Sequence, residues 1–186
     1  MYISTFLGNY GQKYKETRHN LGWMILSKLS FYNSLNWNKK FKGEYSKYSD
    51  LNSVLLKPLT LMNNSGQSVS AALSFFKIKT EDLIIIHDDL ELPYGVIQLK
   101  KGGGTGGHNG LRSIVKETGN NNFYRLRLGI SRPPSGRDVA SYVLNKFSKN
   151  EEAILEEYCE KAANYFENCL KGQLKQSQKI DLVNFF

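Results

Sequence analysis

Histidine and aspartate are the side chains of this sequence best suited to move a proton near neutral pH. His19 stands in the stretch TRHNLG, directly before a segment with helical spacing. Asp88 and Asp89 follow an apolar run, where a carboxylate could orient a histidine and stabilise its protonated form, as in hydrolase triads. The residues alone leave a structural role open for each, because most lone histidines do no chemistry and aspartate is favoured in turns. His87 completes the apolar strand, so we interpret it as structural.

Amide side chains gather in the stretch LMNNSG, near the start of a predicted helix. An amide both donates and accepts hydrogen bonds, so Asn63 is suited to recognising the peptide unit of a substrate. The alternative is a purely local role for this stretch, in which Ser65 or Asn64 caps the helix.

The stretch KGGGTGGHNG at 101–110 has the glycine content of a loop that cradles phosphate. A P-loop is excluded, because the lysine comes before the glycines instead of after the last one. A G-x-G-x-x-G pattern is present, but it lies far from the first predicted strand and no acidic residue follows about twenty positions later. We therefore expect the glycines to bring the backbone close to a ligand and to open a helix at Asn109. His108 is the residue of this stretch that we least expect to do the chemistry.

A metal site built from His19, His87 and His108 has little support in the sequence. No pair of these histidines has the close spacing of metal ligands, and nothing resembles H-E-x-x-H. We therefore expect neither a metal nor another cofactor.

Basic residues are predicted on one face of two neighbouring strands. In YRLRLGI at 124–130 the apolar side chains share one face, while Arg125 and Arg127 share the other. Lys100 ends the neighbouring strand, so Lys100 and Arg127 could clamp a phosphate, although a solvated sheet face fits the same pattern. The formal net charge of +8 and the pI near 9.4 favour a polyanionic partner, with a lysine-rich composition bias as the alternative.

The elements that must position these residues alternate between strands and helices, which is typical of an α/β fold. The patterns predict strands at 3–7, 53–57, 82–87, 96–100 and 124–130, and helices at 21–32, 66–76, 109–118 and 150–170. We expect a single-domain three-layer fold, in which helices flank a mixed, mainly parallel twisted sheet. Asn9, Asn63 and Asp88 follow three of the strands and are expected to converge beyond their carboxyl ends.

Residues 1–186 are expected to form this one domain, with 171–186 as a loosely attached tail. Residues 33–50 fit either a loop or an edge hairpin, and the sequence leaves open whether 135–150 forms a lid. The start of the chain lacks the pattern of a signal peptide, and no apolar run approaches the length of a membrane span. The two cysteines lie too far apart in one predicted helix to bridge, which fits a reducing compartment. We therefore expect a cytoplasmic protein without a membrane partner.

Four motifs, in order along the chain, resemble those of the bacterial peptidyl-tRNA hydrolase family. FLGNYGQKYKETRHNLG at 6–22 is similar to the family's GLGNPGxxYxxTRHNxG, and PLTLMNNSG at 58–66 is similar to its P-x-T-x-M-N-x-S-G. HDDLELPYG at 87–95 resembles HDDLDLPxG, and GGGTGGHNGLRSI at 102–114 resembles GGGxGGHNGLRSI. Four such motifs at compatible spacing make the resemblance highly specific.

The resemblance runs from about residue 3 to residue 170 and implies a monomeric, metal-independent esterase. Such an enzyme cleaves the ester between a peptidyl group and the 3′ end of tRNA, so the implied partner is peptidyl-tRNA. Phe6 and Tyr10 depart from the pattern, since the family has Gly and Pro there, and they affect the turn around Asn9.

The resemblance also implies a role for each matching residue, beginning with His19 as the general base and Asp88 as its orienting partner. The other implied roles are peptide binding and positioning of the water for Asn9, Asn63 and Asn109, lining of the cleft for Tyr14 and Met62, and a clamp on the tRNA 5′-phosphate for Lys100 and Arg127. A non-catalytic RNA-binding protein on the same fold is the alternative, because neither a basic surface nor a fold requires catalysis.

Overall fold

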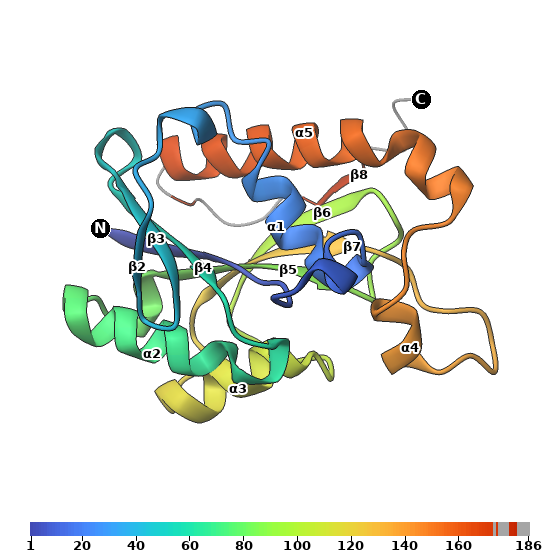
Figure 1. Ribbon diagram of the computed structural model, residues 1–186, viewed down its shortest axis with the longest axis horizontal. Helices are drawn as coiled ribbons and strands as arrows, with labels where there is room; N and C mark the ends of the chain where they lie inside the picture. The colour runs from blue at the N-terminus through green and yellow to red at the C-terminus, as the bar shows by residue number, and fades with distance from the viewer. Residues whose placement is uncertain (173, 175–178, 182–186) are drawn as a thin grey trace.

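The computed structural model describes residues 1–172, 174 and 179–181, which form one sheet with helices on both faces (Figure 1). The described strands lie in the order β2-β3-β4-β1-β5-β7-β6-β8. Their bounds are β1 Tyr2–Phe6, β2 Asn38–Lys40, β3 Gly43–Tyr48, β4 Ser53–Pro58, β5 Leu83–Asp89, β6 Val96–Lys101, β7 Tyr124–Gly129 and β8 Lys179–Asp181. The predicted α/β class with a mixed sheet is confirmed.

The centre of the sheet is parallel and its two edges are antiparallel. β1 lies between β4 and β5, and β5 pairs with β7, all in parallel. The β2–β3–β4 edge and the β7–β6–β8 edge pair antiparallel, so antiparallel pairing is more extensive than we expected. β5 is almost wholly buried, as its continuous apolar run predicts for a central parallel strand. Because the carboxyl ends of β1, β4 and β5 meet at one side of the sheet, the residues that follow them lie together there.

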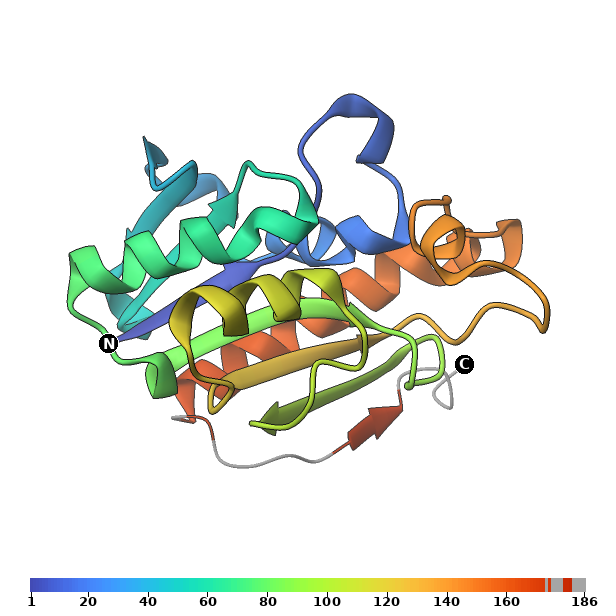
Figure 2. The same cartoon turned by 90° about the horizontal axis from the view of Figure 1, so that it is seen from below.

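The helices cover the two faces of the sheet as separate layers. Their bounds are α1 Leu21–Leu26, α2 Ser65–Phe76, α3 Asn109–Thr118, α4 Val139–Val143 and α5 Lys149–Lys171. α1 and α5 cover one face, while α2 and α3 cover the other, where they lie side by side across the strands (Figure 2). A separate apolar cluster fills each interface between helices and sheet. Residues 135–150 contain α4, and none of the helices described is long and apolar enough to cross a membrane.

The predicted helix 21–32 is wrong in its second half, because α1 ends at Leu26 and the chain continues in turns. Ser30 lies in these turns and donates its backbone N–H and its hydroxyl to Glu167 of α5, at 2.7 and 2.8 Å. This contact joins residues far apart in the sequence, so no local pattern shows it. Leu29 is still buried, which explains why the apolar spacing looked helical.

The two edges of the sheet lie in segments for which the sequence left the structure open or predicted a loose tail. Residues 33–50 contain the edge hairpin of β2 and β3, one of the two alternatives for this segment. In the expected loose tail at 171–186, Leu174 is buried and β8 pairs with β6, so these parts are attached. Residues 173, 175–178 and 182–186 of the tail lie outside the described residues.

Candidate active site

Polar side chains from separate segments meet beyond the carboxyl ends of the central strands. Asn9 follows β1, Asn63 follows β4, Asp88 lies near the end of β5 and Asn109 begins α3. His19 comes from the 3-10 turn that precedes α1. The structure therefore brings together residues that lie up to a hundred positions apart in the sequence.

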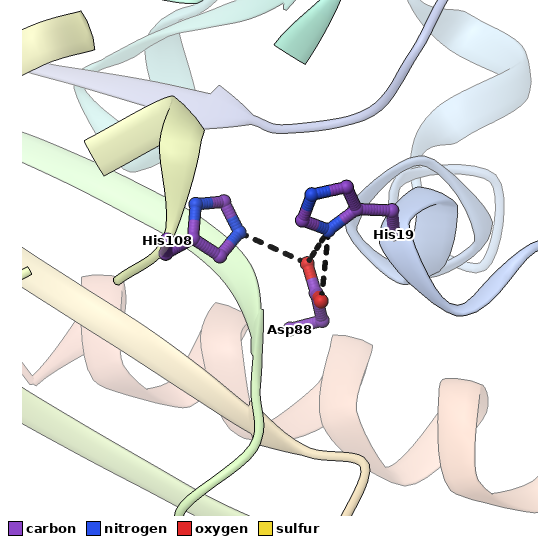
Figure 3. A group of neighbouring side chains, drawn as sticks. All are labelled: His19, Asp88 and His108. Atoms are coloured by element: carbon purple, nitrogen blue, oxygen red, sulfur yellow. Dashed lines mark hydrogen bonds and ion pairs between the residues drawn. The ribbon is translucent and has the colours of Figure 1, made fainter. Parts of the chain in front are cut away.

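His19 and Asp88 form the buried centre of this group (Figure 3). The Nδ1 atom of His19 lies 2.9 Å from each carboxylate oxygen of Asp88. The two side chains expose only 8% and 2% of their surface. Since Nδ1–H donates to the carboxylate, the lone pair of the neutral ring is left on Nε2, which faces away from Asp88.

Burial and charge act against each other at this pair. Burial alone would lower the pKa of His19, but the charge of Asp88 and its hydrogen bond outweigh burial and raise that pKa above the ordinary 6.5. Burial alone would raise the pKa of Asp88, but the charges and hydrogen bonds of His19 and His108 hold it well below its usual range. Asp88 therefore stays ionised near neutral pH and stabilises a proton on His19.

His108 is the third member of this group, although it was the residue of its stretch that we least expected to do the chemistry. Its Nε2 lies 3.0 Å from Oδ1 of Asp88, and its ring centroid lies 4.9 Å from that of His19. Its Nδ1 accepts the backbone N–H groups of Gly110 and Leu111 at 3.1 and 3.3 Å, and thereby caps α3. Because Nδ1 accepts, the proton of the neutral ring sits on Nε2, and this N–H donates to Asp88.

His19, Asp88 and His108 also have ligand atoms within 4.8 Å of one another, which is close enough to hold a metal ion. Sequence spacing did not show this group, because its members come from three separate segments. A metal on Nε2 of His108 would require the ring proton on Nδ1, yet two backbone N–H groups already point at that atom. The donor set therefore fits a carboxylate hydrogen-bonded between two imidazoles better than it fits a metal centre.

The turn around Asn9 is held by hydrogen bonds that the departures at Phe6 and Tyr10 leave intact. Asn20 accepts the backbone N–H of Asn9 at 2.8 Å and donates to its carbonyl at 3.0 Å. The side-chain oxygen of Asn9 accepts the backbone N–H of Met62 at 2.7 Å, so only its NH₂ group is left to donate to a ligand. Phe6 is buried and Tyr10 points to solvent, so neither disturbs the turn. Asn20 therefore holds Asn9 in place, a role that was not predicted from the sequence.

Two cavities meet at His19 and Asn109. The first, of about 210 Å³, is lined by both of these residues and by other residues implicated by sequence, namely Asn9, Tyr14, Met62 and Asn63. The second, of about 350 Å³, extends from Asp88 along the glycine-rich loop to Arg112. Ala140 and Val143 line both cavities, so this part of α4 forms a wall that the cavities share.

Arg18, the chain neighbour of His19, fastens the segment of this wall. Its guanidinium donates to the carbonyl of Lys146 and pairs with Glu151 of α5, each at 2.6 Å. It also lies over the tyrosine ring of α4, 4.1 Å from the ring centroid. Arg18 is buried, so the residue directly before His19 holds the α4 wall that the two cavities share.

Gly110 lets the start of α3 lie against the floor of the cleft. A Cβ atom at this position would lie 2.6 Å from Sδ of Met62 and 2.8 Å from the side chain of Leu7. A larger residue would have to displace these two buried side chains, so glycine permits the close approach that brings His108 and Asn109 to the cleft.

Lys100 and Arg127 line a smaller cavity of about 90 Å³ beside the glycine-rich loop. They are not directly opposite each other, since Arg127 faces Gln98 across the β6–β7 pair and Lys100 faces Arg125. Arg127 donates to Asp89 and to Gln98, both at 2.7 Å, whereas Lys100 is exposed. Arg127 is therefore held in place by two hydrogen bonds, whereas the charge of Lys100 lies in solvent.

Arg125 and His87 have structural surroundings. Arg125 is buried and donates to the carbonyls of Gly103 and Gly104, so it shapes the glycine-rich loop instead of facing solvent. His87 is buried and donates from Nδ1 to the carbonyl of Asp88 at 2.7 Å. Burial, with the charge of a neighbouring histidine, lowers the pKa of His87 to about 3, so its ring is neutral near neutral pH.

Known proteins share this chain's sequence pattern and fold. The family model described as peptidyl-tRNA hydrolase matches residues 3–184. The peptidyl-tRNA hydrolase of Oceanobacillus iheyensis is 44% identical over 171 residues, which cover 90% of this chain and 91% of the relative. That of Wolinella succinogenes is 46% identical over 183 residues, covering 97% and 93%.

A solved structure agrees with these relatives. The crystal structure of the peptidyl-tRNA hydrolase from Acinetobacter baumannii matches this fold with a TM-score of 0.84 and 37% identity, covering 94% of this chain and 90% of that one. The family model spans nearly the whole chain, and the identities extend over more than two thirds of it. The chain therefore belongs to the peptidyl-tRNA hydrolase family, whose members release tRNA and peptide from peptidyl-tRNA.

Proposed function

We propose that this chain hydrolyses the ester between a peptidyl group and the 3′ end of tRNA, with His19 as the general base. The observation that carries the proposal is the His19–Asp88 pair at the meeting point of two cavities. An ester bound across that point has its acyl part in the amide-lined cavity and its leaving group in the other. Membership of the family supports this substrate.

His19 is suited to activate a water molecule directly. In the first step Nε2 takes a proton from the water, whose oxygen forms a bond to the ester carbonyl carbon. Asp88 holds Nδ1–H and stabilises the imidazolium that forms. The imidazolium then returns the proton to the 3′-oxygen as the ester C–O bond breaks. No covalent enzyme intermediate is required.

His108 is assigned a positioning role, because it touches Asp88 and not the reacting atoms. Its Nε2–H occupies Oδ1 of Asp88, while its Nδ1 is fixed by the start of α3. The carboxylate is thus held between two rings, and its orientation is set before the substrate arrives.

The amide side chains are assigned to the peptide and the oxyanion. Asn63 and Asn109 are exposed in the cleft and offer both donors and an acceptor, which suits a peptide unit and the oxygen of a tetrahedral intermediate. Asn9 offers its NH₂ group alone, while Tyr14 and Met62 line the same cavity.

Lys100 and Arg127 are assigned to the 5′-phosphate of the tRNA. Arg127 presents a planar guanidinium that Asp89 and Gln98 hold in place, and Lys100 adds a compact charge. Their cavity adjoins the glycine-rich loop, which also forms part of the larger cavity.

The test is hydrolysis of an N-blocked aminoacyl-tRNA by the intact protein and by His19→Ala. We expect kcat to fall by about 10²–10⁴-fold while tRNA binding is retained, because only proton transfer is lost. Unblocked aminoacyl-tRNA serves as the control substrate and should be cleaved little by either protein. Full activity in folded His19→Ala protein would exclude His19 as the base.

We also propose that the enzyme is a monomer, works without a metal, and acts in the cytoplasm, where its substrate is formed. Incubation with a strong chelator followed by its removal should leave kcat unchanged, and loss that zinc restores would contradict this. Sedimentation at several protein concentrations checks the oligomeric state.

A further inference from the structure

A second surface of the molecule combines exposed cations with aromatic rings, away from the cleft. It consists of the tip of the β2–β3 hairpin and the last turn of α2, which lie beside each other (Figures 1 and 2). We call it the tip patch, and its residues are Phe41, Phe75, Phe76, Lys40, Lys42 and Lys47. None of them lines a cavity of the active site.

The turn of the hairpin is strained. Lys40 pairs with Gly43, so Phe41 and Lys42 form a two-residue connection, with positive φ values of 58° and 52°. Such a turn ordinarily carries glycine or asparagine, and a bulky residue in the left-handed region is strained. Contacts of the Phe41 ring with Phe75 and Phe76, at 5.2 and 5.7 Å between centroids, hold it there.

Cations lie over these rings without anionic partners. Nζ of Lys40 lies 3.6 Å from the centroid of Phe75, and Nζ of Lys47 lies 5.4 Å from that of Phe76. Within the described parts of the chain, no carboxylate lies at ion-pair distance from any lysine of the tip patch. Phe75 is 52% exposed, so an apolar ring and uncompensated charges share one accessible surface.

Protection of the sheet edge explains only part of this surface. Lysines on the exposed strand β2 do discourage pairing with another chain. That role requires neither an exposed phenylalanine on a separate helix nor a strained aromatic turn. A flat ring flanked by unpaired lysines is instead the arrangement that binds unpaired nucleotides, since bases stack on the ring and phosphates contact the cations.

We propose that the tip patch binds an unpaired segment of the tRNA part of the substrate, outside the cleft. This rests on the proposed substrate, because tRNA is the polyanion that the enzyme must hold. A base stacks on Phe75 in place of the Lys40 ammonium, and the released Lys40, with Lys42 and Lys47, contacts the adjoining phosphates.

The place of the tip patch in the fold suits a contact made in addition to the cleft. Gly43 pairs with Pro58 at the carboxyl end of β4, the side of the sheet on which the cleft lies. α2 begins beside the cleft residue Asn63 and carries Phe75 near its other end, about 15 Å further along the helix. The tip patch therefore extends the surface available to RNA and lies apart from the catalytic group, which consists of His19, Asp88 and His108.

Phe75→Ala tests the stacking with two substrates. With N-blocked aminoacyl-tRNA we expect KM to rise about tenfold at unchanged kcat, the equivalent of ~1.4 kcal/mol. With an N-blocked aminoacyl acceptor duplex of two strands, unpaired only at its CCA end, KM should not change. Phe75→Trp, which keeps a flat ring, should retain the KM of the intact protein, and Phe75→Leu should behave like Phe75→Ala.

A binding measurement keeps the test independent of hydrolysis. The anisotropy of a labelled unpaired octaribonucleotide should show weaker binding to Phe75→Ala. A Lys40→Gln, Lys42→Gln and Lys47→Gln variant should have a salt slope smaller by about 0.7 per lost contact. Lys149→Gln, an exposed charge on α5, is the control and should change neither quantity. Tighter binding of an acidic octapeptide than of the RNA, an unchanged KM with tRNA, or equal changes with both substrates would overturn the proposal.

Discussion

The catalytic group and the tip patch both place charges beside rings, but they hold those charges in opposite ways. In the catalytic group every ring and the carboxylate are largely buried, and each faces a hydrogen-bond partner at about 3 Å. In the tip patch the lysines are exposed: Lys40 and Lys47 lie over the faces of rings, and Lys42 donates to the side-chain oxygen of Gln67 at 2.8 Å. The difference indicates that the first is built for a directed proton transfer and the second for an adaptable contact.

Burial decides how strongly each region responds to the loss of one group. A buried charge that loses its partner keeps the cost of its desolvation, so a single substitution has a large effect. An exposed lysine is already hydrated, and its loss removes only a screened interaction. The expected effects of substitution therefore fall steeply from the catalytic group to the exposed lysines.

Asp88→Asn should break the catalytic group most severely of the changes that spare His19. We expect kcat to fall on the order of 10³–10⁴-fold, because the imidazolium loses its counter-charge and the ring can adopt the wrong tautomer.

The pKa of His19 is raised by Asp88, and activity requires neutral His19, so the intact enzyme should gain activity as pH rises through a midpoint above 6.5. In the variant that midpoint should move to lower pH. A pH–rate profile measures both effects, and an unmoved midpoint would mean that another group sets it.

His108 both donates to Asp88 and caps α3, and the variants His108→Ala and His108→Asn together separate these two roles. Both variants lose the hydrogen bond to Asp88, so both should lose about ten- to a hundredfold in kcat. Asparagine is a favoured cap, so only His108→Ala should also lower the free energy of unfolding, by about 1 kcal/mol. Denaturant unfolding beside steady-state kinetics checks the pair. Equal stability with unequal activity would contradict this division of roles.

Asn63→Ala and Asn109→Ala address the open part of the cleft. We expect kcat/KM to fall about tenfold for each, since one hydrogen bond to a neutral or developing charge is lost. The midpoint of the pH profile should stay where it is, because neither residue touches His19 or Asp88 by a hydrogen bond. Asn64→Ala, next to Asn63 but not in the cleft lining, is the matched control.

Lys100→Gln should produce the smallest change. We expect KM for N-blocked aminoacyl-tRNA to rise a few-fold and its salt slope to fall by about 0.9, while cleavage of a minimal ester stays the same. Lys101→Gln removes the adjacent charge, which lies over Tyr124 and outside the small cavity, and it should leave the slope unchanged. Equal effects of Lys100→Gln on both substrates would contradict a phosphate contact.

The sequence predicts best those elements whose pattern has one physical cause. The apolar run before His87 and the spacing in 109–118 correspond to β5 and α3, since burial on both faces or on one stripe explains them fully. The helix expected at 21–32 failed after Leu26, because a contact with α5 determines the turns that follow. Propensity is a weak guide where distant residues supply the hydrogen bonds.

The residues of the active site show the same contrast between what a local pattern predicts and what distant contacts determine. His19 and Asp88 come from recognisable motifs, and their pairing follows from strands that end on one side of the sheet. His108 was considered in the sequence but was not predicted as a cap, because histidine is not among the favoured caps, although it directly precedes the predicted helix. Its bond to Asp88 depends on three-dimensional closeness that Gly110 permits, and a single sequence does not display it.

The pairing of β8 with β6 also bears on the tendency of the sheet to pair with strands of other chains. β6 would otherwise present an open row of backbone donors and acceptors at the end of the sheet, next to the strand that carries Arg127. An open edge of this kind is a template for adding strands from other chains. Residues 179–181 pair with Val96, Ile97 and Gln98 and leave a strand of only three residues at this edge, so shortening the protein after Lys171 should expose β6 and make the sheet more prone to aggregate.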